Sequence, residues 1–171
     1  CQGGLYNSVI RGLQQLGLAD PFGNSRIPIY CMNVTYPMVP EEVTDFCAGK
    51  RSVCIVEEGF PEYLEQALNA TLRKADLNTT IVGKDVFPRA GEYQSEVMMN
   101  GLARFIEGAV PKGVDLAQVS AVTKAVSDNK ALAAELLGSP IPKRPPGFCT
   151  GCPERPVFSA LKLAQLDPEI G

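Results

Sequence analysis

The sequence predicts an α/β protein whose mostly parallel sheet lies between two layers of helices, a three-layer arrangement. Two observations carry the prediction. Short apolar runs of strand length alternate with amphipathic helical segments, an order typical of crossovers between parallel strands. The runs are also nearly continuous in apolar residues, as in strands covered on both faces. We expect this domain to span residues 1–108, with its first strand truncated upstream.

The first helix is expected over residues 5–16, because leucine and valine residues recur there at spacings of four, four and three. Gly17 follows and is expected to end this helix. A turn rich in Pro, Gly, Asn and Ser then leads to an apolar run at 27–34, which we interpret as a strand.

The next elements follow from the same reasoning. A helix opens at Pro40, where proline suits the first turn and the two glutamates after it complement the helix dipole. Further strands are expected at 52–56 and 79–82, a helix begins at Pro61, and another covers about 95–106.

The chain after residue 108 is different in character. Residues 109–147 are expected to form a helical and proline-rich linker, with short helices near 115–127 and 129–137. Residues 148–171 would then be the start of another domain. We expect the chain to be an internal part of a longer polypeptide, because it opens without methionine and closes after a helix with nothing to pack against.

Composition limits the function classes. Of the 171 residues, 45% are hydrophobic and 20% charged, which is a globular balance. The net charge of −3 and the absence of a basic stripe argue against a nucleic-acid partner. No apolar run approaches the ~20 residues that cross a bilayer, so we expect no membrane association and a cytoplasmic location. The chain has no histidine, which excludes Ser-His and Cys-His catalytic pairs within these residues.

Three of the six cysteines are expected to be ordinary packing residues. Cys31 and Cys54 lie in apolar runs, and Cys47 lies on a predicted helix. In a reducing compartment such thiols are usually small buried hydrophobes rather than parts of a disulfide framework.

Cys149 and Cys152 form the one motif that packing does not readily explain. A Cys-x-x-Cys pair at the start of a helix is compatible with a dithiol redox site, a structural zinc site or an iron–sulfur cluster. The redox fold needs a substantial sheet afterwards, zinc needs two further ligands that the chain does not supply, and a cluster can recruit its other thiolates from far along the chain. Two incidental cysteines in a turn are the remaining alternative.

Two weaker candidates lie at predicted strand ends. Glu57 and Glu58 follow the strand at 52–56, where paired carboxylates can act in acid–base chemistry or bind Mg²⁺, or can cap the next helix. Gly3 and Gly4 precede the first helix and could cradle a phosphate.

The cysteine motif also carries a family resemblance. Residues 144–161, which include Cys149, Cys152 and Pro153, resemble the opening of the thiamine-diphosphate-binding domain of the 2-oxoacid:ferredoxin oxidoreductases. The proline after the second cysteine is most similar to the indolepyruvate branch, large (alpha) subunit. The segments at 35–42, 53–58 and 82–92 are similar to that subunit's transketolase-C-terminal-like domain.

The resemblance implies an oxidative decarboxylase. A thiamine diphosphate–Mg²⁺ cofactor would act on an indolepyruvate-like or other aryl 2-oxoacid, with coenzyme A taking the acyl group. A [4Fe–4S] cluster would pass electrons to ferredoxin, and a second oxidoreductase subunit or domain would be a partner. Cys149 and Cys152 would be cluster ligands, with the other ligands beyond Gly171.

Glu154 departs from the family pattern. Many indolepyruvate-type relatives have histidine there, and some pyruvate-type relatives have glutamate nearby, which leaves the substrate branch open. Glu154 would either approach the cofactor or be a solvated carboxylate in the first helical turn. The alternative function is a non-catalytic α/β interaction module with a zinc-binding dithiol tail. By itself the chain is expected to be inactive, because both thiamine-binding halves would lie elsewhere.

Overall fold

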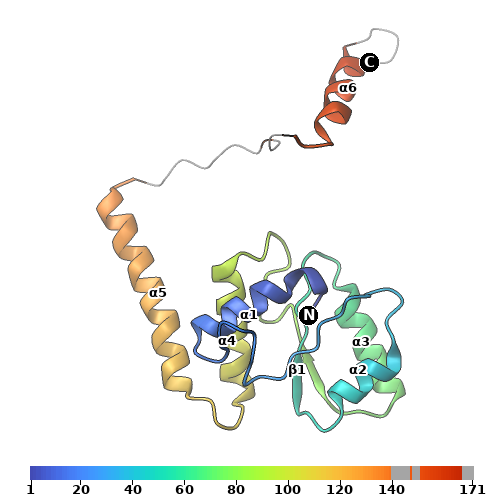
Figure 1. Cartoon of the computed structure of the whole chain (residues 1–171), viewed down its shortest axis with the longest axis vertical. Helices are drawn as coiled ribbons and strands as arrows, with labels where there is room; N and C mark the ends of the chain where they lie inside the picture. The colour runs from blue at the N-terminus through green and yellow to red at the C-terminus, as the bar shows by residue number, and fades with distance from the viewer. Residues whose placement is uncertain (140–146, 148–150, 167–171) are drawn as a thin grey trace. The chain divides into compact units, whose positions relative to one another are not determined.

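The computed structural model describes residues 1–139, 147 and 151–166, which fall into two compact units, Cys1–Ala131 and Leu132–Gly171. The first unit is an α/β domain in which helices lie on both sides of a parallel pair of strands (Figure 1). The elements run in the order η1 (Gly3–Leu5), α1 (Tyr6–Gln15), α2 (Pro40–Cys47), β1 (Ser52–Cys54), α3 (Tyr63–Lys74), β2 (Thr80–Val82), α4 (Ser95–Ala109), α5 (Leu116–Leu137) and α6 (Arg155–Gln165).

The strands β1 and β2 pair in parallel, with Val53 opposite Ile81, so the predicted parallel sheet is confirmed for these two strands. The extended backbone continues past β1, because Ile55 N–H donates to Val82 O at 2.9 Å. Gln2 N–H donates to Val56 O at 3.2 Å and places the start of the chain beside this extension.

The prediction of a strand at 27–34 is wrong for most of its length. In the described residues it forms one parallel bridge, between Gln2 and Met32. The physical reasons are that Pro28 lacks an N–H and that only the first three residues of the chain are beside the segment as partners. The segment is extended but is not a regular strand.

Side chains of β1 alternate between two hydrophobic cores. Cys54 and Val56 pack on the core of α1 and α4, whereas Val53 and Ile55 pack on the core of α2 and α3. Figure 1 shows α1 and α4 on one side of β1 and α2 and α3 on the other. This alternation is the period of two expected for a strand covered on both faces, and it confirms helices on both faces.

The predicted helices are largely confirmed. Gly17 follows the C-cap residue of α1 and has a φ of +72°, as expected for a glycine that ends a helix. Pro40 opens α2. The third helix begins at Tyr63, two residues after the predicted Pro61. The prediction of two helices near 115–127 and 129–137 is wrong, because α5 runs through Asn129 without a break.

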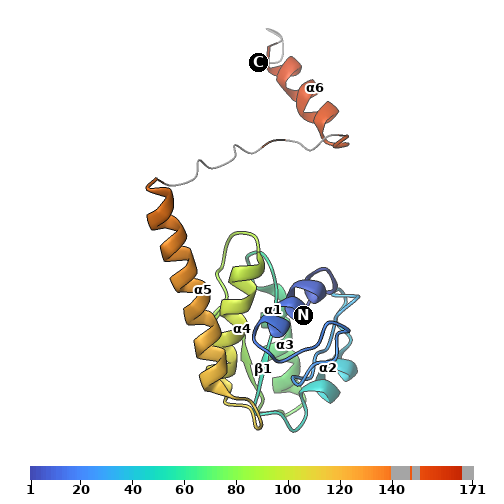
Figure 2. The same cartoon turned by 60° about the vertical axis from the view of Figure 1, so that its left-hand side comes forward.

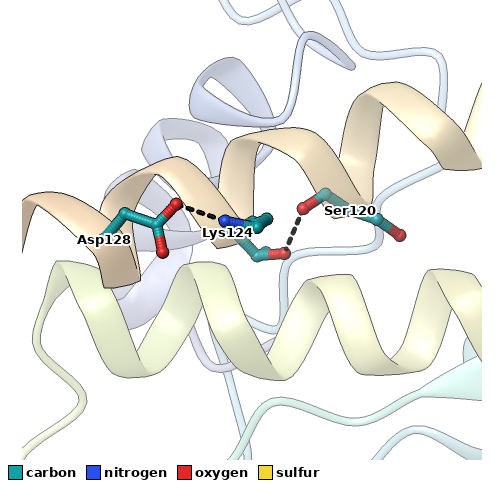
Figure 3. A network of polar contacts seen from close by, with 4 residues as sticks. Ser120, Lys124 and Asp128 are labelled. Carbon is teal, nitrogen blue, oxygen red and sulfur yellow. Dashed lines mark hydrogen bonds and ion pairs between the residues drawn. The ribbon is translucent and has the colours of Figure 1, made fainter.

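Helix α5 is fixed to the rest of the first unit through Val119 and Lys130. Val119 is fully buried in the core of α1 and α4, and Lys130 donates to the carboxylate of Glu96 on α4 at 2.9 Å. Figure 2 shows the first turns of α5 running beside α4. Its exposed side carries an ion pair one turn apart, Lys124 with Asp128 (Figure 3). Both side chains of that pair are mostly exposed, so it contributes little to stability.

No helix among the described residues is both long and apolar enough to cross a membrane. The predicted domain limits at residues 108 and 147 are not tested by this arrangement and stay predictions.

Candidate functional site

One of the two predicted metal ligands, Cys152, lies just before α6. Cys149 is outside the described residues. Cys152 is half-buried in the turn that precedes α6, and its carbonyl accepts a hydrogen bond from Arg155 N–H at 3.3 Å. Gly151 has a φ of +77°, a left-handed conformation that glycine adopts without strain. The backbone therefore turns sharply just before Cys152.

Glu154 is the N-cap residue of α6 and is exposed. Its side chain makes no capping hydrogen bond, although its carbonyl accepts from Phe158 N–H at 3.1 Å. A carboxylate at this end complements the positive pole of the helix dipole. Glu154 thus lies at the start of the helix, as expected for a solvated carboxylate. Its approach to a cofactor stays a prediction.

Helix α6 presents apolar side chains on its surface. Val157 and Leu161, one turn apart on the same face, are each more than half exposed. Such a face is unusual for a helix that is complete in itself, and it is expected where a helix packs on further structure. The cysteine turn thus precedes a helix with apolar surface available for packing.

The described residues contain no group of three or more cysteine, histidine, aspartate or glutamate side chains that could hold a metal ion. The described cysteines Cys1, Cys31, Cys47, Cys54 and Cys152 are all free thiols. Cys47 is buried, as predicted, whereas Cys31 and Cys54 are half-buried. Burial raises the pKa of Cys54 to about 12, so this thiol stays protonated and is not a ready ligand.

A second polar group lies where the strands of the first unit end. Glu57 is the buried charged residue of that unit, at 6% exposure. Its two carboxylate oxygens accept from the backbone N–H groups of Leu64 at 2.9 Å and Glu65 at 3.2 Å. These N–H groups belong to the first turn of α3. Among the roles predicted for Glu57, the helix cap is the one the structure shows.

Glu58 is tied to a different segment. Its carboxylate accepts from Tyr93 N–H at 2.6 Å, and its own N–H donates to the side chain of Gln2 at 3.2 Å. Gly3 N–H is likewise used, since it donates to Met32 O at 2.9 Å, so it is not open to a phosphate. Glu57 and Glu58 therefore do not converge on one open site.

Lys84 and Tyr93 complete this polar group and were not singled out from the sequence. The Lys84 ammonium donates to Glu57 O at 2.5 Å and to the Tyr93 hydroxyl at 2.8 Å, and that hydroxyl donates to Pro88 O at 2.7 Å. Burial lowers the pKa of Lys84, an effect that the nearby carboxylates led by Glu57 offset. Burial also raises the pKa of Tyr93 to about 12.

The position of Lys84 directly after the Val82-Gly83 strand end was a usable signal, because parallel strands place such residues at one edge. Tyr93 lies in a loop and gave none. With each of its bonds made inside the protein, this group joins β1, β2 and α3 and has a structural role.

Comparison with known proteins identifies relatives along almost the whole chain. The sequence is 28% identical over 170 residues to the indolepyruvate oxidoreductase subunit IorA of Methanothermobacter thermautotrophicus, covering 98% of this chain and 23% of the relative. The subunit of the same name from Thermococcus kodakarensis is 28% identical over 159 residues, 93% of this chain and 22% of the relative. That of Pyrococcus abyssi is 27% identical over 142 residues, 83% of this chain and 20% of the relative.

The fold and these matches define what the chain resembles. It is an α/β protein related to subunits of oxidoreductases. The resemblance inferred from the sequence is confirmed: the relatives are named indolepyruvate oxidoreductase subunit IorA. The chain spans about a fifth to a quarter of the length of these relatives. No family model and no solved structure matches it, so the transketolase-C-terminal-like fold stays a prediction.

Proposed function

We propose that this chain is part of a thiamine-diphosphate-dependent 2-oxoacid:ferredoxin oxidoreductase that acts on indolepyruvate or another aryl 2-oxoacid. The observation that carries the proposal is the match, over 98% of this chain, to a subunit named for indolepyruvate oxidoreductase. Ferredoxin, coenzyme A and a second oxidoreductase subunit or domain are the proposed partners.

Cys149 and Cys152 are the proposed ligands of a [4Fe–4S] cluster. Cys152 lies half-buried in the turn before α6, where the positive end of the helix dipole favours a thiolate. Gly151 allows the close turn that two thiolates on one cluster need. When bound, the cluster would carry single electrons toward ferredoxin.

The fit of the remaining cofactors to the described residues is incomplete. A [4Fe–4S] cluster takes four thiolates, and the motif offers two. No described group of acidic residues could hold the Mg²⁺ of thiamine diphosphate. The proposal therefore assigns the other cluster ligands and the thiamine site, which supplies the decarboxylation chemistry, to residues outside this chain. Glu154 is the one exposed carboxylate here that is proposed to approach the cofactor.

The test is anaerobic reconstitution of the full-length polypeptide with iron and sulfide. We expect a broad visible absorption band and bound iron, both lost in Cys149→Ser and in Cys152→Ser. Cys31→Ser is the matched control: it removes a half-buried thiol from the other unit and should leave iron content unchanged. Binding of zinc with no visible band would overturn the proposal and favour an interaction module with a dithiol zinc site.

A further inference from the structure

Cys1 and Cys31 face each other across a short parallel ladder. The Cys1 nitrogen donates to Tyr30 O at 2.8 Å, and Cys1 O accepts from Met32 N–H at 2.8 Å. In a parallel ladder a residue bonds to the two residues that flank its partner, so Cys1 is directly opposite Cys31. The parallel bridge between Gln2 and Met32 continues the same register.

The side chains of these two cysteines lie on the same side of the ladder. Ile29 packs on the core of α1 and α4, whereas Tyr30 and Met32 pack on the core of α2 and α3. Because side chains alternate along extended backbone, Cys31 lies on the side of Ile29. Cys1 packs on the core of α1 and α4 as well. The two thiols are therefore neighbours on one face.

The separation of the two residues suits a disulfide. Neighbouring strands lie about 4.8 Å apart, and disulfides join residues whose Cα atoms are roughly 4.4–6.8 Å apart. Both cysteines are free thiols. The bond to Tyr30 O requires only an N–H, which a peptide group has as well as an amino group. The opposed positions of Cys1 and Cys31 therefore do not depend on a charged chain start.

The Cys31 thiol lies at the surface of the first unit. Its Sγ is 3.9 Å from Oδ1 of Asn33, which is an exposed residue. In the part of the chain that the structure describes, Cys31 belongs to neither hydrophobic core. A small reagent can therefore reach this thiol.

Cys54 is also near the Cys1 nitrogen, but it is a poor competitor for a bond to Cys1. It packs on the core of α1 and α4, and burial raises its pKa to about 12. Thiol–disulfide exchange proceeds through the thiolate, which Cys54 does not form near neutral pH.

We propose that Cys1 and Cys31 form a reversible disulfide when the surroundings become oxidising, and that this bond fastens the segment at 27–34 to the start of the domain. With a small disulfide as the oxidant, the Cys31 thiolate attacks one of its sulfurs and releases a first small thiol. The Cys1 thiolate then attacks Sγ of Cys31 in the mixed disulfide and releases the second. Two electrons pass from the cysteines to the small disulfide, and the released thiols take up the two protons that the cysteines lose. This inference does not depend on the proposed catalytic function.

The test places the chain in a buffer of oxidised and reduced glutathione. The remaining thiols are then blocked with N-ethylmaleimide, and the disulfides are mapped by mass spectrometry of peptides. We expect a peptide pair joined through Cys1 and Cys31, with Cys54 left as a thiol. Amide exchange at Gly3 and Met32, whose bonds close the ladder, should slow by at least about threefold in the oxidised chain.

The matched control moves a thiol along the segment and keeps the number of cysteines. It carries Cys31→Ser together with Asn33→Cys, at a position that is exposed in the original chain. Two residues span about 6.6 Å along a strand, so the Cα of the moved cysteine is more than about 7 Å from that of Cys1, too far for a disulfide without backbone movement. Bridging to Cys1 should be slower by at least about tenfold than in the original chain.

Four results would each overturn the proposal. They are equal bridging rates in the original chain and the control, single glutathione adducts on Cys1 and Cys31 without a bridge, a bond between Cys1 and Cys54, and amide exchange that oxidation leaves unchanged.

Discussion

The carboxylate of Glu57, just past β1, accepts a 2.9 Å hydrogen bond from the backbone N–H of Leu64 in the first turn of α3. Because the second oxygen accepts from Glu65 N–H, one side chain closes the start of the helix. Glu57→Ala should lower the free energy of unfolding by about 1–3 kcal/mol, since one buried and one partly buried donor lose their partner. Glu57→Gln should lose less, because its amide oxygen can still accept. Urea unfolding measures both, and exposed Glu92→Ala should stay within about 0.5 kcal/mol of the original protein.

The Tyr93 hydroxyl predicts a loss of stability at high pH. Burial raises its pKa from the ordinary value of 10.0 to about 12 in the folded protein. Between these values the unfolded chain releases the proton first, so the stabilisation is present below pH 10 and is lost as pH rises toward about 12. Tyr93→Phe should flatten the decline of the unfolding free energy over this window. The lowered pKa of Lys84 acts in the opposite direction in both proteins.

Exposed Tyr63→Phe is the control for that measurement and should leave the slope of the original protein unchanged. A decline of equal steepness in Tyr93→Phe and the original protein would contradict the prediction.

Two glycines of α4 should respond in opposite ways to alanine. A Cβ at Gly101 would overlap the ring of Phe87, which is itself buried and stacked on Tyr93. Gly101→Ala should therefore cost about 1–3 kcal/mol or more through overpacking. Gly108 has open space around its Cβ position, so Gly108→Ala should stabilise by up to about 1 kcal/mol through helix propensity. Thermal unfolding of the pair checks this, and a shift of the same sign in both would contradict it.

The cysteines should differ in their reaction with iodoacetamide near neutral pH. Cys47 is buried, and burial raises its pKa; burial also raises the pKa of Cys54 to about 12. Cys152 is half-buried in a turn. Because the thiolate is the reacting species, Cys152 should be labelled well before Cys47 and Cys54. Mass spectrometry of peptides over time measures the order. In urea the three rates should become similar, and faster labelling of Cys54 in the folded protein would show the prediction to be wrong.

Much of the helical structure could be predicted because it depends on local pattern. The apolar spacing before Gly17 and the proline at position 40 mark α1 and α2 in the sequence alone. The interruption expected near Asn129 was wrong for a physical reason. Ser, Asp and Asn in a helix interior each cost only fractions of a kcal/mol, roughly, so a helix without Pro or Gly continues through them.

The parts that could not be predicted depend on contacts between distant segments. An apolar run at 27–34 has the composition of a strand, but whether it forms one depends on what lies beside it, and here that is only the start of the chain. The same holds for Tyr93, whose burial against Phe87 and bond to Lys84 bring together residues without a shared motif. The ligand role proposed for Cys152, in contrast, rests on the family resemblance and not on contacts between distant segments.

The alternation of β1 side chains determines how the first unit should unfold. Since neighbouring residues of one strand are anchored in opposite cores, α1 with α4 cannot separate from β1 without also exposing the inner face that holds α2 and α3. Heating should therefore produce one cooperative melting step for these helices, with circular dichroism and tyrosine fluorescence changing at the same temperature.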